Sequence, residues 1–215
     1  MNRVLLLLAT LAWVAPPTAD AAVIFESGVL GPTGLEKGAV AASVVASDVF
    51  AGVRFQLTEP VVTSQVGGHF VDRSNGTFFG AIVRLDNEND FPNSGDLSTP
   101  DVLGAAVLIF PVPSAEVFGN LAIALDPGWY ALVFGSGLFG AAGDGAAPLN
   151  NPDIGSPTYI AFQPGAVSGW GVLLNPIFRN FRFVVNGQVV PEPSTVGLIS
   201  VAVFALMAHL RKPTR

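Results

Sequence analysis

The chain has 215 residues, of which 50% are hydrophobic and only 12% charged, and its formal net charge is −6. An acidic balance argues against nucleic-acid binding, because a negative surface repels the phosphate backbone. The chain contains no cysteine, which excludes disulfides, Cys–His catalysis and a zinc site built from several cysteines and histidines.

The N-terminus predicts a secretory signal peptide. Arg3 precedes an apolar run over residues 4–15, two prolines end that run, and Ala19-Asp20-Ala21 has the small residues of a cleavage site. A membrane anchor is the alternative, but the apolar run is short for that role. We therefore expect residues 1–21 to be a signal peptide removed after Ala21, and residues 22–190 to form one exported domain.

Residues 22–190 carry the patterns of short strands. In residues 50–57, apolar side chains alternate with Gly52, Arg54 and Gln56, which is the period of a half-buried strand. Residues 78–85 are a further predicted strand. Residues 121–125 and 129–134 are predicted strands on either side of a turn at Asp126-Pro127-Gly128. Residues 181–185 are a strand that ends in Asn186-Gly187, a pair typical of hairpin turns. We predict an all-β fold, an antiparallel β-sandwich that is jelly-roll-like.

Residues 102–110 are nearly all apolar. Such a run fits a strand covered on both faces, and it equally fits a short helix packed against an open end of the sandwich. Periodicity does not choose between these two structures.

Alternating carboxylates make residues 86–96 a candidate calcium loop. Asp86, Glu88, Asp90 and Asp96 offer the hard oxygen ligands that Ca²⁺ prefers. The loop departs from the EF-hand pattern, because Phe91 replaces the glycine and Leu97 the glutamate at the twelfth position. The alternative is a solvated acidic turn between two strands.

Few residues suggest catalysis. His69 is the only histidine between residues 22 and 190, and after Gly67-Gly68 it is expected at a solvated strand end. A carboxylate-based glycoside hydrolase would need two apposed acids, for which Asp144 with Asp153, or Asp86 with Asp90, are the candidates.

Aromatic side chains suggest glycan binding as another function. Trp129, Tyr159 and Trp170 would stack on sugar faces if their rings were exposed. The alternative is that these large rings belong to the core of the domain.

The C-terminus combines a motif, an apolar run and a basic end. Pro191-Glu192-Pro193 is a stiff, extended connector, and the fifteen residues Val196–Leu210 carry no formal charge. As a helix this run spans about 22 Å, which is short for a bilayer. It is apolar on every face, however, and Arg211, Lys212 and Arg215 follow it. We predict a single transmembrane helix at about residues 195–210 with a cytoplasmic basic tail.

This order of motif, helix and basic tail over residues 191–215 resembles the PEP-CTERM sorting signal of Gram-negative bacteria that make extracellular polysaccharide. The resemblance implies processing by exosortase next to Pro191-Glu192-Pro193. It also implies a precursor anchored in the inner membrane and then placement in the cell envelope, at the surface or in the matrix. Residues 125–135 and 181–187 resemble the β-rich passenger domains of such proteins, a likeness that implies no catalytic residue.

Together these patterns predict an exported, non-enzymatic envelope or matrix protein. Its expected partners are exosortase, the inner membrane before processing, and exopolysaccharide or other envelope components, with no nucleic acid. The alternatives are a calcium-dependent glycan-binding module and a carboxylate-based glycoside hydrolase.

Overall fold

The computed structural model describes residues 22–36, 38–39, 41–163, 169–174 and 179–190. Within these ranges the regular elements are all strands, and both sheets are antiparallel, so the prediction of an all-β domain is confirmed. No helix suited to crossing a membrane occurs among the described residues. The predicted signal peptide, Pro191-Glu192-Pro193, the predicted transmembrane helix and the basic tail lie outside them.

The first sheet has seven strands and is organised around β4 (Val61–Asp72). β13 (Phe183–Val189) pairs along one edge of β4, and β8 (Ala124–Leu125) and β7 (Ala115–Asn120) pair in succession along the other. β1 (Ala22–Glu26) pairs with the outer edge of β13, while β10 (Gly145–Pro148) joins the end of β4 to β2 (Ala42–Val45).

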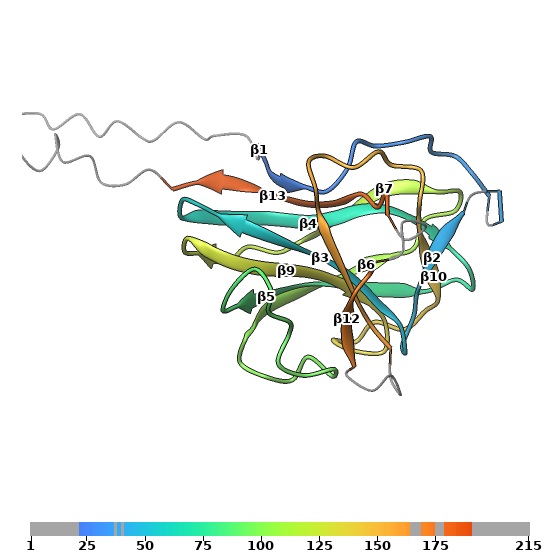
Figure 1. The fold of residues 1–215 in the computed structure, drawn as a ribbon. Helices are drawn as coiled ribbons and strands as arrows, with labels where there is room; N and C mark the ends of the chain where they lie inside the picture. The colour runs from blue at the N-terminus through green and yellow to red at the C-terminus, as the bar shows by residue number, and fades with distance from the viewer. Residues whose placement is uncertain (1–21, 37, 40, 164–168, 175–178, 191–215) are drawn as a thin grey trace, which may run out of the picture.

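The second sheet has six strands and lies under the first (Figure 1). Its order is β12 (Trp170–Val172), β11 (Thr158–Phe162), β3 (Phe50–Leu57), β9 (Gly128–Gly135), β5 (Thr77–Leu85) and β6 (Val102–Ile109). The predicted alternation in β3 is confirmed, because Val53, Phe55 and Leu57 point into the core between the sheets. The strand is not half-buried as predicted, since Arg54 on its other face is only 6% exposed.

Two local predictions are wrong. Residues 102–110 form neither a helix nor a strand covered on both faces, because β6 is an edge strand on which Val107 and Ile109 are exposed. Asn186-Gly187 makes no hairpin turn, because the pair lies inside β13 with β1 on one side and β4 on the other. There Gly187 allows a close approach, since a Cβ atom would lie 2.4 Å from the carbonyl oxygen of Val62. Pairing on both edges outweighs the local turn preference.

The second sheet is covered on both faces. Its inner face packs against the first sheet around Phe70, Phe78, Phe134 and Phe183, all fully buried. Its outer face packs against Phe91 and Leu97 from the β5–β6 connection and against Leu138 and Ala141 from the β9–β10 connection. These two connections therefore direct apolar side chains toward the sheet, and these side chains form a second core cluster.

Replacing Phe70 with alanine is expected to lower the free energy of unfolding by about 3–5 kcal/mol, because a fully buried ring would leave a cavity between the sheets. Its ring centroid lies 4.4 Å from that of Phe78 and 4.9 Å from that of Phe134. Urea unfolding followed by intrinsic fluorescence measures the change. Phe118→Ala is the matched control, since that ring on β7 is 36% exposed and its loss should cost clearly less. Equal losses in the two variants would contradict the packing described.

Candidate functional site

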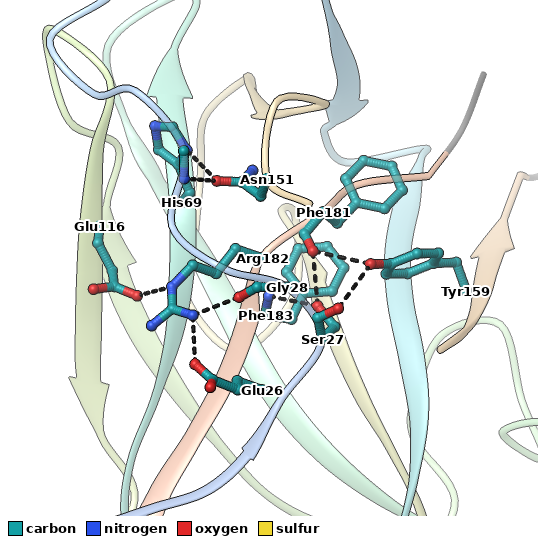
Figure 2. Close-up of polar contacts among 11 residues, drawn as sticks. Glu26, Ser27, Gly28, His69, Glu116, Asn151, Tyr159, Phe181, Arg182 and Phe183 are labelled. Carbon is teal, nitrogen blue, oxygen red and sulfur yellow. Dashed lines mark hydrogen bonds and ion pairs between the residues drawn. The ribbon is translucent and has the colours of Figure 1, made fainter. Parts of the chain in front are cut away.

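Arg182, the residue before β13, joins three segments that are distant in sequence (Figure 2). Its Nε donates to the carboxylate of Glu116 on β7, and a terminal nitrogen donates to Glu26 on β1 and to the carbonyl oxygen of Gly28. Burial alone would lower the pKa of Arg182, but the hydrogen bonds and charges of Glu26 and Glu116 raise it above its ordinary value. The guanidinium is therefore charged, and its Nε and one terminal nitrogen are hydrogen-bonded. We call it, with Glu26 and Glu116, the Arg182 cluster.

A second set of hydrogen bonds lies beside the Arg182 cluster. The hydroxyl of Ser27 donates to the carbonyl oxygen of Phe181 and accepts from the amide of Phe183. The hydroxyl oxygen of Tyr159 lies 2.6 Å from a carboxylate oxygen of Asp153 and 2.9 Å from the carbonyl oxygen of Phe181. Burial, followed by the hydrogen bond to Asp153, raises the pKa of Tyr159. Its hydroxyl consequently stays protonated and serves as a donor that holds Asp153 in place.

His69 lies in this same region, and its predicted position at a solvated strand end is wrong. It is fully buried within β4, with Nδ1 2.9 Å from the side-chain oxygen of Asn151. The amide nitrogen of Asn151 donates to the carbonyl oxygens of Pro148 and Asn180, so its oxygen faces His69 and Nδ1 is the donor. Among the described residues, the other ring nitrogen has no hydrogen-bond partner. No hydroxyl nucleophile therefore contacts His69 in the described part of the chain.

The misleading signal was the glycine pair before His69. A Cβ atom at Gly67 would lie 2.0 Å from the carbonyl oxygen of Val117, and one at Gly68 would lie 2.1 Å from that of Arg182. These glycines allow close approach of the neighbouring chain segments within the sheet. They do not end the strand.

The predicted calcium loop packs on Arg54, which projects from the outer face of β3. The two terminal nitrogens of Arg54 donate to the carbonyl oxygens of Glu88 and Asn89, and its guanidinium lies 4.2 Å from the centroid of the Phe91 ring. This arrangement fixes the backbone of the loop from below.

The carboxylates of this loop bind its own backbone. Asp90 accepts a hydrogen bond from the amide of Asp86, and Asp96 accepts from the amide and hydroxyl of Ser98, which lowers the pKa of Asp96. In the parts of the chain that the structure describes, no three side chains of His, Cys, Asp or Glu gather as a metal site. The structure thus gives no support to calcium binding at Asp86, Glu88, Asp90 and Asp96.

The three aromatic residues predicted to bind glycan do not form an exposed surface. Tyr159 is 2% exposed and Trp170 is 7% exposed, and Trp129 packs half-buried against the outer core. The ring nitrogen of Trp170 donates to the carbonyl oxygen of Ser94, which ties the β5–β6 connection to β12. Burial of these large rings stabilises the domain, although Tyr159 lines a pocket between residues 153–159 and the end of β12.

A small surface pocket lies between residues 153–159 and the end of β12, with a volume of about 320 Å³. Its polar lining includes Asp153, Ser156, Thr158 and Arg179, and Leu174 supplies apolar surface. Asp153 is the only acidic residue and Arg179 the only basic residue among the described residues of this lining. Asp144, the other half of one proposed catalytic pair, forms an ion pair with Arg73 instead. The pocket has the groups to hold a small polar ligand, whereas a glycosidase requires a second carboxyl group.

Sequence patterns alone could not reveal this pocket or the Arg182 cluster. Arg182 is 156 residues from Glu26 and 66 from Glu116, and no local motif links such positions. Arg179 and Ser156 likewise carry no signal until the fold brings their segments together.

The described residues form an all-β domain of two antiparallel sheets with a partly buried ionic cluster and a small polar pocket. No model of a known protein family matches the chain, and a comparison with curated proteins finds no matching relative.

The stability of the domain is expected to fall as the pH decreases below about 6.5, the ordinary pKa of histidine. Burial lowers the pKa of His69 in the folded state, so the unfolded chain binds a proton first. The contribution of neutral His69 to the free energy of unfolding is complete above the ordinary pKa of histidine. It decreases as the pH falls from that value to the lower pKa of His69 in the folded state. Urea midpoints measured between about pH 5 and pH 8 should show the slope, and His69→Gln should flatten it. If both proteins show one and the same slope, His69 is not the group responsible.

Proposed function

We propose that this chain is an exported, non-enzymatic protein of the cell envelope or extracellular matrix. Its β-domain is the passenger, and the segment from Pro191 to Arg215 is its PEP-CTERM-type sorting signal. In this proposal exosortase acts beside Pro191-Glu192-Pro193 while the C-terminal apolar segment holds the precursor in the inner membrane. Released or surface-held protein then contributes to the polysaccharide-containing envelope or matrix.

The observation that best supports this proposal is the pairing of the first and last strands. Ala22, which follows the predicted cleavage site, pairs with Gly187, three residues before Val190. The predicted signal peptide and the predicted sorting signal would therefore leave the domain at the same end. A precursor attached to the membrane at that end would keep the rest of the domain free on the exported side.

The Arg182 cluster also supports a domain that can stay folded after export. It connects the first strand, β7 and the last strand without cysteine, so the domain does not depend on the redox state of its compartment. β1 and β13, the first and last strands of the domain, are thus both part of one folded sheet.

Glu192→Ala is expected to leave the protein in the membrane fraction as the longer precursor and to reduce the processed form several-fold. The reason is that the substitution removes the charge from the Pro-Glu-Pro connector. Cell fractionation with immunoblotting, and mass spectrometry of the C-terminus, measure the two forms in the producing bacterium. Glu59→Ala is the matched control, because Glu59 also precedes a proline and is exposed on the folded domain. Unchanged processing in Glu192→Ala would reject the sorting proposal.

A second candidate function is binding of a sugar unit in the pocket between Asp153 and Arg179. A carboxylate that accepts and a guanidinium that donates can hold neighbouring sugar hydroxyls, and Leu174 offers an apolar surface to the sugar ring. Tyr159 and the amide of Asn180 hold Asp153 in position. Of the three aromatic residues predicted to bind glycan, this site contains Tyr159, and it needs no calcium.

Retention of the protein on the exopolysaccharide of its own host tests this candidate. We expect binding that survives chelation of calcium and weakens about tenfold in Arg179→Gln, because a hydrogen bond from a charged donor contributes about 1.5 kcal/mol or more. Arg84→Gln, at an exposed arginine on β5, is the matched control. No retention, or retention that is equal in both variants, would remove this candidate, and loss on chelation would restore the calcium-dependent alternative.

A further inference from the structure

β6 ends the six-stranded sheet and has an open edge. Among the described residues it pairs only with β5, so the backbone groups along its other edge have no strand partner. Such an edge is able to add a further strand by main-chain hydrogen bonding. A register irregularity opposite Ile82 and Val83 affects the first residues of β6, and Gly104–Ile109 is regular.

This edge lacks the usual protection against strand addition. Natural edge strands commonly carry charged residues or proline, whereas no charged residue occurs between Asp101 and Glu116 and the first proline follows the end of β6. Val107 is 46% exposed and Ile109 is 73% exposed. These two residues lie opposite Phe79 and Thr77, on the outer face of the sheet.

An exposed apolar surface continues from β6 onto the neighbouring loop. Phe139 is 42% exposed, and its ring packs edge-on against Phe79 with 5.1 Å between the centroids. Val107 pairs with Phe79 in register. A strand added to β6 would cover part of this surface as well as the open edge.

We infer that β6 is a self-association edge, at which a second copy of this chain adds its own β6 in antiparallel orientation. A twofold-symmetric pair of this kind places the same segment opposite itself, and like charges facing each other across strands are destabilising. β6 is free of that penalty because it is uncharged. The inference does not depend on how the protein is sorted.

The remaining sheet ends fit this role less well. β12 has three residues and β2 has four, which limits the number of main-chain hydrogen bonds that either can add. β1 includes Glu26, which already binds Arg182. β7 and β8, which each pair only with β4, have six and two residues, and β7 carries Glu116. β6, with eight residues, is the longest of these strands with an open edge.

The charge of the domain also favours this edge. Residues 22–190 contain six basic and fourteen acidic residues, so two copies repel each other over most approaches. Contact through the neutral stretch from Val102 to Ala115 brings together two surfaces that carry no formal charge. Another copy of the chain is thus matched to this edge in both backbone geometry and charge.

Light scattering after size-exclusion chromatography of the full chain in detergent should give twice the monomer mass. Val107→Lys should convert it to monomer by placing like charges in the pair, and Ile109→Lys should do the same at a second exposed position. Val172→Lys, on the open edge of β12 where Val172 is 36% exposed, should leave the mass unchanged. Thermal melts confirm that each variant is folded.

The absence of cysteine offers an independent measurement. A Val107→Cys variant should form a disulfide-linked dimer under mild oxidation, while Val172→Cys should stay largely monomeric. A monomeric wild-type chain, equal effects of the lysine variants, or equal crosslinking at the two positions would overturn the inference. If the chain is monomeric and a different protein binds along β6, the edge belongs to that partner and the inference of self-association is overturned.

Discussion

The charge of Arg182 is the constraint on which the arrangement of this domain depends. Its guanidinium side chain is only 11% exposed, and an isolated charge in such a position would be strongly destabilising. Two carboxylates and a carbonyl oxygen accept hydrogen bonds from it, and they come from β1, β7 and the segment that follows β1. The first strand is consequently held against the last by a charged group as well as by the strand ladder. In a chain without disulfides, these contacts join the first and last strands of the described domain.

Loops with polar surfaces also contribute apolar side chains to the core of this domain. The acidic connection between β5 and β6 has carboxylates on its surface, yet Phe91 and Leu97 beneath it cover the outer face of the six-stranded sheet. Arg54 donates hydrogen bonds to the carbonyl oxygens of Glu88 and Asn89 in this connection, and Trp170 donates one to that of Ser94. The pattern of alternating acids therefore stabilises turns in the loop, which explains why a sequence resembling a metal loop shows no metal-site geometry.

Sequence patterns predicted the class of fold because that information is local. Alternation in residues 50–57 describes β3, and the predicted strand over residues 129–134 lies within β9. The patterns failed where a neighbouring strand decides the conformation. Asn186-Gly187 favours a turn in isolation, but pairing with β1 and β4 keeps it extended. Gly67-Gly68 likewise suggested a strand end from local sequence alone. In the structure the two glycines lie inside β4 and allow the backbone of neighbouring segments to approach closely.

The candidate sites were less predictable, because exposure is a property of the whole fold. Trp170 and Tyr159 have the chemistry of sugar-binding residues, but the surrounding strands bury both. Conversely, Val107 and Ile109 read as core residues and lie at the surface because β6 is the last strand of its sheet. Nothing in the local sequence distinguishes an edge strand from a central one when both are apolar.

The position of β6 within the sandwich allows self-association and membrane attachment at the same time. β7 pairs with the edge of β4 opposite to β13, and residues of β7 pack against β6, where Gly119 approaches Ala106 and Leu108. On the other side, β1 lies over β3, with Phe25 stacked on Phe55. The strands that carry the ends of the domain and the open edge of β6 are thus on opposite sides of the two sheets. A second copy bound at β6 would leave β1 and β13 uncovered, so a sorted and anchored chain would keep this edge available for assembly.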